Sequence, residues 1–367
     1  SVASSRPLAR RPEIGHTPET RFAPEEPHMR QTILPAFAAA FVTAMLAATT
    51  VAAPSGGQTF TDPAAADADF PFQGEYAGAV KYDSGEAEFG VQVIARGEGT
   101  FDAVAYPGGL PGAGWTPPDT IRGTGVRAGD VVRLEGVDLG GATRRGEIRG
   151  GSLVVLDEGG DAIATLPRVN RESPTLGATP PAGAIVIFDG PGPVDENKTL
   201  DNPKLTEDGL LMQGVATQQE FGDATWHIEF RLPYQPAARG QGRGNSGAYF
   251  QGRYEVQMLD SFGLEGKDNE CGGIYSVAAP SVNMCLPPLA WQTYDVEVTS
   301  PRYDGDTKVA DARLTVRHNG VVVHNNVEVS KVTPAGRDGK DKTRGPLYLQ
   351  DHGNPVRYRN IWVVPKP

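Results

Sequence analysis

Apolar and polar residues alternate with a period of two through most of the second half of the chain. In residues 225–233, for example, Trp226, Ile228 and Phe230 alternate with polar residues, which is the period of a half-buried β-strand. The same alternation recurs in 244–260, 291–300, 313–325, 346–353 and 356–364. No helical period persists between these segments, so the pattern predicts an all-β antiparallel sandwich or jelly roll over residues 184–367.

Residues 70–169 contain shorter alternating runs that glycines interrupt about every ten residues. This pattern predicts a small antiparallel β-domain of six to eight strands. Its unusual feature is the Gly/Pro loop 108–115, which ends in Trp115. We interpret Trp115 either as a packing residue beneath the loop or as a stacking surface for a sugar.

Low-complexity segments separate these regions from the rest of the chain. Residues 54–69 are expected to form a flexible linker, and residues 170–183 a second linker between the two β-regions. Residues 1–28 are polar and patternless, and we interpret them as a non-native upstream extension. Residues 29–53 combine a basic start at Met29, an apolar run and small residues at the end. This predicts a signal peptide and a secreted or periplasmic protein without stable membrane insertion after cleavage. The alternative is a membrane anchor.

Composition and charge exclude several classes of protein. Glycine (46) and proline (31) make up about a fifth of the 367 residues, which argues against helical bundles and coiled coils. The net charge of −11 without a basic stripe argues against a nucleic-acid partner. Cys271 and Cys285 are the only cysteines. In an exported protein we expect them to form a disulfide, and the alternative is two buried free thiols.

The polar faces of the predicted strands are rich in amides, guanidinium groups and tyrosine. These planar groups donate and accept hydrogen bonds, which suits a ligand with many hydroxyl groups. If the strands are neighbours, the side chains would converge in a groove that binds a carbohydrate. The alternative is a solvated face with scattered ion pairs. The side chains concerned are Asn245, Tyr249, Gln251, Glu255, Gln257, Gln350, His352, Arg357 and Arg359.

The densest polar cluster is Gln350-Asp351-His352-Gly353. A histidine beside carboxylates can act as a general base or bind a metal. His227 is a weaker candidate for such chemistry, and an isolated histidine is more often structural.

Seven segments, in order, resemble the bacterial 3-keto-disaccharide hydrolase family. They are IVIFDG (185–190), WHIEFRL (226–232), GNSGAYFQGRYEVQMLD (244–260), GGIYSVAAPSVN (272–283), WQTYDVEV (291–298), GPLYLQDHG (345–353) and VRYRNIWV (356–363). The resemblance implies a concanavalin A-like jelly roll that acts outside the cytoplasm on sugars oxidised at C3. It adds Tyr275 and Asn283 as substrate-binding candidates. The insertion 236–244 is expected to be a mobile loop.

A ketone at C3 acidifies the proton on C2 of a sugar. Removing that proton gives an enolate that can expel the glycosidic oxygen from C1, after which water adds back. Glu255 and His352 are the candidates for base and acid, and Asp351 could orient the imidazole or bind a metal. Asn245, Tyr249, Gln257, Gln350 and Arg359 would hold hydroxyl groups or the C3 oxygen. The sequence demands no cofactor, although a divalent metal at His352 and Glu255 would stabilise the enolate.

Two other hypotheses remain open from the sequence. Glu255 and Asp260 have the outer spacing of the E-x-D-x-x-E signature of jelly-roll glucanases, in which paired carboxylates hydrolyse with retention. Strand parity would place these two carboxylates on opposite faces unless a bulge intervenes. The third hypothesis is a carbohydrate-binding module without catalytic activity.

Overall fold

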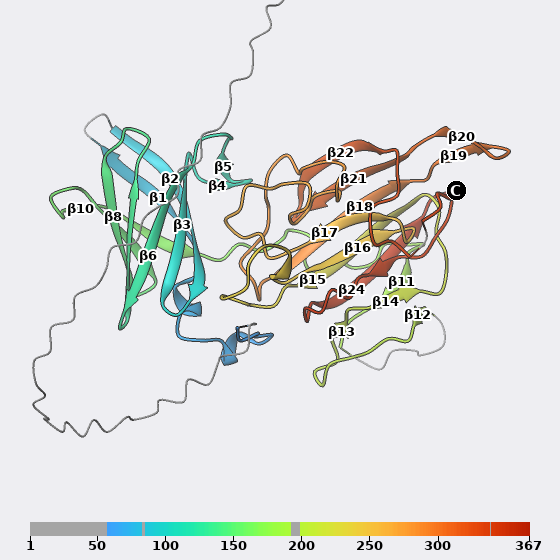
Figure 1. Ribbon diagram of the computed structural model, residues 1–367, viewed down its shortest axis with the longest axis horizontal. Coiled ribbons are helices and arrows are strands. Elements are labelled where there is room, and N and C mark those ends of the chain that lie inside the picture. The colour runs from blue at the N-terminus through green and yellow to red at the C-terminus, as the bar shows by residue number, and fades with distance from the viewer. Residues whose placement is uncertain (1–56, 83–84, 192–198, 338) are drawn as a thin grey trace, which may run out of the picture. The chain divides into compact units, whose positions relative to one another are not determined.

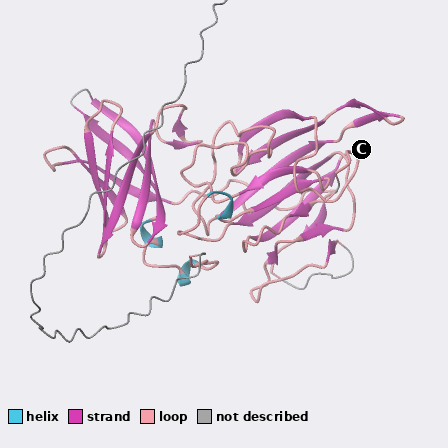
Figure 2. Ribbon diagram, viewed as in Figure 1, coloured by secondary structure: helices cyan, strands magenta, loops and turns pink. Residues whose placement is uncertain are grey.

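Nearly every regular element of the protein is a β-strand (Figures 1 and 2). The computed structural model describes residues 57–82, 85–191, 199–337 and 339–367. Its helical elements in these ranges are three short 3₁₀ turns, η1 (Pro63–Ala65), η2 (Phe70–Phe72) and η3 (Gly240–Gly242). The expected all-β fold class is therefore confirmed.

Two predictions concern the N-terminal residues 1–53. The upstream extension (1–28) and the signal peptide (29–53) lie outside the described residues, and both stay predictions. Within the described ranges, no helix has the length and apolar character needed to cross a membrane.

Eight antiparallel strands close into a barrel in the order β1-β10-β9-β8-β7-β6-β3-β2. Glycines break the alternating runs into hairpins, and apolar side chains at alternate positions, such as Tyr76, Phe101 and Leu166, fill the interior. A short parallel pair, β4 and β5, forms the loop after β3. The strands are β1 (Gly74–Tyr82), β2 (Gly85–Gly97), β3 (Thr100–Pro107), β4 (Leu110–Pro111), β5 (Gly114–Trp115), β6 (Ile121–Ala128), β7 (Val131–Val137), β8 (Thr143–Arg149), β9 (Ser152–Leu156) and β10 (Ala162–Val169).

The second region is a sandwich of two antiparallel sheets. One sheet has seven strands, in the order β11-β24-β15-β18-β21-β22 with β13 on β24, and the other has the order β12-β14-β23-β16-β17. A separate hairpin joins β19 and β20. The strands are β11 (Ile185–Phe188), β12 (Leu200–Asp201), β13 (Leu211–Met212), β14 (Val215–Thr217), β15 (Ala224–Arg231), β16 (Ser246–Phe250), β17 (Tyr254–Met258), β18 (Trp291–Thr299), β19 (Arg302–Asp304), β20 (Thr307–Ala310), β21 (Ala312–His318), β22 (Val321–Val329), β23 (Tyr348–Leu349) and β24 (Arg357–Pro365).

One apolar core lies between the two sheets. Trp226, Ile228 and Phe230 of β15 face Ala248 and Val256 of the other sheet within it. The faces that the alternation assigned to these strands are therefore confirmed. The first and last strands of the sandwich, β11 and β24, pair with each other and so tie its two ends together (Figure 1).

Both segments expected to be loose linkers are held against the folded chain. In the linker 54–69, the backbone of Phe60 pairs with that of Tyr234, and the Tyr234 hydroxyl donates to Asp67 (3.0 Å). In residues 170–183, Ser173 and Thr175 hydrogen-bond to Thr293 (2.6 and 2.9 Å). A low-complexity segment has no apolar pattern from which packing could be predicted, but it keeps its hydrogen-bonding groups. In both segments these groups form the hydrogen bonds to the folded chain. The described residues, from 57 onward, belong to one compact unit.

Candidate functional site

The outer face of the five-stranded sheet carries a group of uncharged and acidic polar side chains. In β16 and β17, Ala248 and Val256 point into the core, so Tyr249 and Glu255, which are paired across the two strands, point outward. Gln350, just after β23, reaches the same face. We define the polar sheet face by Gly247, Tyr249, Glu255, Gln257, Tyr348 and Gln350. The structure thus brings together four of the candidates named from the sequence.

Glu255 is the carboxyl group of this face, and its side chain is buried, with 3% of the residue exposed. Burial raises the pKa of Glu255 to about 7, although a hydrogen bond with Tyr249 offsets part of the increase. Glu255 and its cross-strand partner Tyr249 both lie outside the hydrophobic core between the two sheets. A carboxyl group with this pKa is present in both protonation states at neutral pH, which suits proton transfer.

Gly247 provides the space that the Glu255 carboxyl group occupies. A Cβ atom added at Gly247 would lie 2.3 Å from Oε1 of Glu255. The φ angle of Gly247 lies outside the left-handed region, so alanine would fit the backbone there. The glycine is explained by the neighbouring carboxyl group and not by the strand conformation.

Tyr249 and Gln350 add further polar atoms to the same sheet face. The Tyr249 hydroxyl donates to the carbonyl of Pro334 (2.9 Å) and accepts from Nε2 of Gln350 (3.2 Å). The Oε1 atom of Gln350 is buried and has no hydrogen-bond partner within the described part of the chain. An unpaired buried acceptor costs about 1–3 kcal/mol. Gln350 therefore offers an acceptor that a ligand hydroxyl group would satisfy.

Gln241 organises the other end of the polar sheet face. Its Oε1 accepts hydrogen bonds from Nδ2 of Asn245 and Nε2 of Gln257, both at 3.1 Å, and its Nε2 donates to the carbonyl of Asn269 (2.8 Å). Oδ1 of Asn245 is a second buried acceptor that no described residue satisfies. Gln241 was not predicted from the sequence as a residue of this face. Its Arg/Gly-rich segment has no alternation of apolar and polar residues that could assign it to a face.

The insertion 236–244, expected to be a mobile loop, is fixed to the fold by polar contacts at its C-terminal end. Arg243 forms a buried ion pair with Asp260 (2.6 Å), and the Gly244 backbone N–H donates to Gln235 (2.6 Å). The same ion pair argues against the glucanase hypothesis. Asp260 is committed to Arg243 beyond the end of β17, so it does not form a catalytic carboxylate pair with Glu255.

His352 and Asp351 lie in the exposed turn that follows Gln350. Asp351 accepts a hydrogen bond from the backbone N–H of Gly353 (2.9 Å). His352 forms no hydrogen bond or ion pair with any residue that the structure describes. The expected orientation of the imidazole by Asp351 is therefore not formed, because the carboxylate stabilises the turn instead.

Tyr275 and Asn283, the two candidates from the family resemblance, lie in different surroundings. The backbone N–H of Tyr275 donates to the carbonyl of Glu255 (3.1 Å), which places this half-buried tyrosine beside β17. The side chain of Asn283 instead donates to the carbonyls of Ser261 and Leu264 (2.7 and 3.0 Å). Asn283 therefore holds a loop together and has no hydrogen bond to the polar sheet face.

Arg359 is not part of the polar sheet face, and the prediction that it lies there is wrong. It belongs to β24 of the seven-stranded sheet, where Tyr358 points into the core and Arg359 points outward. The outward faces of the two sheets of a sandwich point in opposite directions. Arg359 pairs with Glu229 (2.7 Å), and its guanidinium lies 4.1 Å from the ring centre of Trp291.

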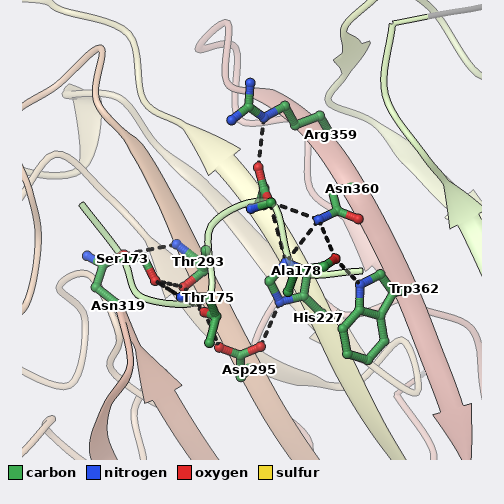
Figure 3. A network of polar contacts seen from close by, with 12 residues as sticks. Ser173, Thr175, Ala178, His227, Thr293, Asp295, Asn319, Arg359, Asn360 and Trp362 are labelled. Carbon is green, nitrogen blue, oxygen red and sulfur yellow. Dashed lines mark hydrogen bonds and ion pairs between the residues drawn. The ribbon is translucent and has the colours of Figure 1, made fainter. Parts of the chain in front are cut away.

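A buried polar network on the seven-stranded sheet surrounds this ion pair (Figure 3). The carboxylate of Glu229 accepts hydrogen bonds from Arg359 (2.7 Å), from Nδ2 of Asn360 (2.9 Å) and from the backbone of Gly177 (2.5 Å). Burial alone would raise the pKa of Glu229, but these hydrogen bonds and one with His227 lower it to about 2. The network fastens residues 173–178 to the sheet.

His227 is part of this network and is fully buried. Its Nδ1 lies 2.6 Å from Oδ1 of Asp295, whose other oxygen accepts from Thr175 (2.7 Å), as Figure 3 shows. Burial would lower the pKa of His227, but the hydrogen bonds with Asp295 and Glu229 outweigh it and raise the pKa. The structure gives His227 a role in holding the chain together, away from Glu255.

The residues do not fit the divalent metal that the sequence suggested. Among the described residues, no three His, Cys, Asp or Glu side chains converge in a way that could hold a cation. His352 and Glu255 have no third ligand of this kind, so we derive no step through a metal.

Cys271 and Cys285 are buried free thiols, so the expected disulfide is not formed. The Cys271 sulfur lies 3.3 Å from the Tyr294 hydroxyl, and the Cys285 thiol donates to the carbonyl of Leu259 (3.6 Å). Burial and the neighbouring Cys271 raise the pKa of Cys285 well above its ordinary value. The alternative of two buried thiols describes this structure.

Comparison with known proteins gives one family. The model of the 3-keto-alpha-glucoside-1,2-lyase-like domain matches residues 183–364. Two crystal structures of Parabacteroides distasonis proteins, proposed to be glycosyl hydrolases, are similar to this chain. The first is 30% identical, with 51% of this chain and 85% of the other covered and a TM-score of 0.46. The second is 18% identical, with 54% and 99% covered and a TM-score of 0.37. No curated protein matches the chain.

Proposed function

The chain belongs, through residues 183–364, to the 3-keto-alpha-glucoside-1,2-lyase-like family, and from this premise we propose that its polar sheet face cleaves glycosides whose sugar is oxidised at C3. Membership of the family makes it a carbohydrate-active protein. The observation that carries the finer proposal is the buried Glu255, whose pKa is raised to about 7 on a face of neutral polar groups.

Glu255 is the base in this proposal. A base of pKa near 7 is sufficiently ionised at neutral pH and still strong enough to accept a proton from a carbon acid such as C2 of a 3-keto sugar. Gln350 and Asn245 each present a buried acceptor oxygen, which suits the hydroxyl groups of a neutral sugar. Tyr249 lies opposite Glu255 across the two strands, and we assign its hydroxyl to the developing negative charge, to which it would donate in place of the carbonyl of Pro334.

The reaction then proceeds in two steps, elimination followed by hydration. Glu255 takes the proton from C2, and the C–H electrons form an enolate with the C3 carbonyl. The enolate returns its electrons to form a C1–C2 double bond, which breaks the bond from C1 to the glycosidic oxygen, and the leaving oxygen takes a proton. Water adds to C1 as a hydroxyl group and gives its other proton back to the acid, while Glu255 returns its proton to C2, so the net reaction is hydrolysis. His352, which is exposed and lies beyond Gln350, is our candidate for the acid that donates a proton to the leaving group.

The test compares 3-keto and unoxidised p-nitrophenyl glucosides of both anomeric forms. We expect release of nitrophenol from a keto form only, and a slower kcat when C2 carries deuterium, because that bond breaks. Equal turnover of the keto and unoxidised forms would contradict the elimination. Binding of either form without turnover would contradict catalysis and leave a carbohydrate-binding module.

Gly247→Ala is expected to lower kcat on the keto glucoside by about tenfold or more. The new methyl group would lie 2.3 Å from Oε1 of Glu255 and must displace the carboxyl group from its position, and small misplacements of catalytic groups are costly. The matched control is Gly242→Ala, since a Cβ there meets no atom within 4 Å. Unchanged kcat in Gly247→Ala would show that the position of the carboxyl group is not important.

A further inference from the structure

Trp115 lines a cleft that the proposed reaction does not use. The cleft has a volume of about 360 Å³ and is lined on one side by barrel residues that include Tyr106 and Trp115, and on the other by residues that include Glu265 and Asn283. A second cavity of about 580 Å³ adjoins it and shares Arg122 in its lining. Ligand sites in proteins have volumes of about 300–1,000 Å³, so the cleft is large enough for a small saccharide.

The loop that carries Trp115 has its shape imposed by glycine. Gly109 and Gly114 have φ angles of 132° and 105°, which other residues rarely adopt. A Cβ atom at either position would lie 2.2 Å from a carbonyl oxygen on the opposite side of the loop. The two halves of the loop are therefore in direct backbone contact, and β5 delivers the tryptophan at a defined place.

The indole ring of Trp115 is itself fixed in orientation. Its Nε1–H donates to the carbonyl of Asp119 (2.7 Å), and its ring meets that of Tyr106 edge to face, with 5.1 Å between centres. Tyr106 is in turn buried, and its hydroxyl donates to Gln92 (2.7 Å). Since the indole N–H is already paired, the partly exposed ring offers flat apolar surface to the cleft. A rigid aromatic surface binds a ligand at a low cost in conformational entropy.

The charged groups at the cleft favour a neutral ligand. Arg122 and Glu265 lie 3.7 Å apart, and their side chains are 53% and 63% exposed. An exposed pair at this distance contributes little to stability, so both side chains can turn towards hydroxyl groups. Their charges cancel, which disfavours an anion or a cation. We propose that the cleft beside Trp115 is a second carbohydrate site, which binds a neutral oligosaccharide by stacking a sugar ring on the indole.

This site is distinct from the polar sheet face. None of the residues that define that face lines the cleft, and Asn283, expected from the sequence to contact the substrate, lies in the cleft lining instead. The second site would hold a glycan chain on the protein while Glu255 acts on an oxidised sugar. It does not depend on the proposed reaction and can be correct if that reaction is wrong.

The experiment uses the chain labelled with 5-fluorotryptophan, in the Glu255→Gln background so that no turnover occurs. The protein has four tryptophans, and Trp115→Phe identifies the ¹⁹F resonance of Trp115 by its loss. We expect titration with neutral tetrasaccharides of glucose and xylose to shift this resonance saturably, and tetragalacturonate to leave it unchanged. Trp115→Ala should weaken binding of the responding tetrasaccharide, measured by calorimetry, by about tenfold or more.

Trp291→Phe is the control, because Trp291 is also partly exposed but its ring is covered by Arg231 and Arg359. It should leave the affinity unchanged. The proposal is overturned if no neutral tetrasaccharide shifts the Trp115 resonance, or if Trp115→Ala binds as tightly as the parent protein. The resonance shift in the parent does not require Trp115→Ala to fold, so it tests the proposal on its own.

Discussion

Replacing Glu255 by glutamine is expected to lower kcat on a 3-keto glucoside by about 10²–10⁴-fold, the range that positioned acid–base groups contribute. Glutamine preserves the shape of the side chain and one acceptor oxygen but cannot accept a proton from C2. In the parent protein, kcat/KM should fall as pH falls through about 7, because the base is protonated there. Residual activity of Glu255→Gln should lack this step.

The same substitution should not destabilise the protein. The folded-state pKa of Glu255 is raised from 4.5 to about 7, so the folded state holds this proton more tightly than the unfolded state does. Stability is therefore lost as pH rises from about 4.5 through 7, by up to about 3 kcal/mol for this buried group. Glutamine removes that loss, and urea unfolding at pH 7 should show equal or greater stability. Glu297→Gln is the activity control, because Glu297 is an exposed residue of the seven-stranded sheet. A Glu255→Gln variant with more than a tenth of the parent kcat would rule out Glu255 as the base.

Glu229→Gln is expected to lower the free energy of unfolding by about 3 kcal/mol. The substitution removes a fully buried charge from Arg359, His227 and the backbone of Gly177, and breaking a buried ion pair by removing one partner costs several kcal/mol. Glu297→Gln is the matched control, because that carboxylate pairs with Arg317 and Lys366 while 40% exposed. An exposed pair should contribute less than about 1 kcal/mol. Urea unfolding of both variants at pH 6 makes the comparison.

The pH dependence of stability provides a second measurement of this network. The pKa of Glu229 is lowered from 4.5 to about 2, so its contribution is complete above about pH 4.5 and is lost as pH falls through about 2. The pKa of His227 is raised above 6.5, so its contribution is complete below pH 6.5 and is lost as pH rises through the folded-state value. In a plot of the free energy of unfolding against pH, Glu229→Gln should reduce the loss of stability on the acid side. His227→Gln should reduce the loss on the alkaline side. If Glu229→Gln costs no more than Glu297→Gln, the network does not hold residues 173–178 in place.

The alternation of residues was sufficient to predict one half of the site. In residues 244–260 it placed Tyr249, Glu255 and Gln257 opposite Ala248 and Val256, and the structure has this arrangement. The reason is that strand geometry is local: successive side chains point to opposite faces whatever the rest of the fold does. Gln241 had no such pattern, and it reaches Gln257 from a loop that the Arg243–Asp260 ion pair helps to hold beside β17.

Arg359 shows the limit of the same reasoning. Alternation correctly made it outward-facing on β24, but a sandwich has two outward faces, and strand parity does not say to which sheet a strand belongs. That choice is made by pairing with β11, β13 and β15, strands that are distant in sequence from β24. The position of Asn283 depends in the same way on loop contacts with Ser261 and Leu264.

The sequence by itself determined the β-class of the protein, the inward and outward sides of its strands, and the family to which residues 183–364 belong. These follow from local residue periodicity and from short motifs. Only the tertiary structure decided which outward side chains meet, that Glu255 is buried enough for its pKa to rise to about 7, and that Trp115 stands at a cleft. Burial and proximity arise when distant segments pack together, and no local pattern contains them.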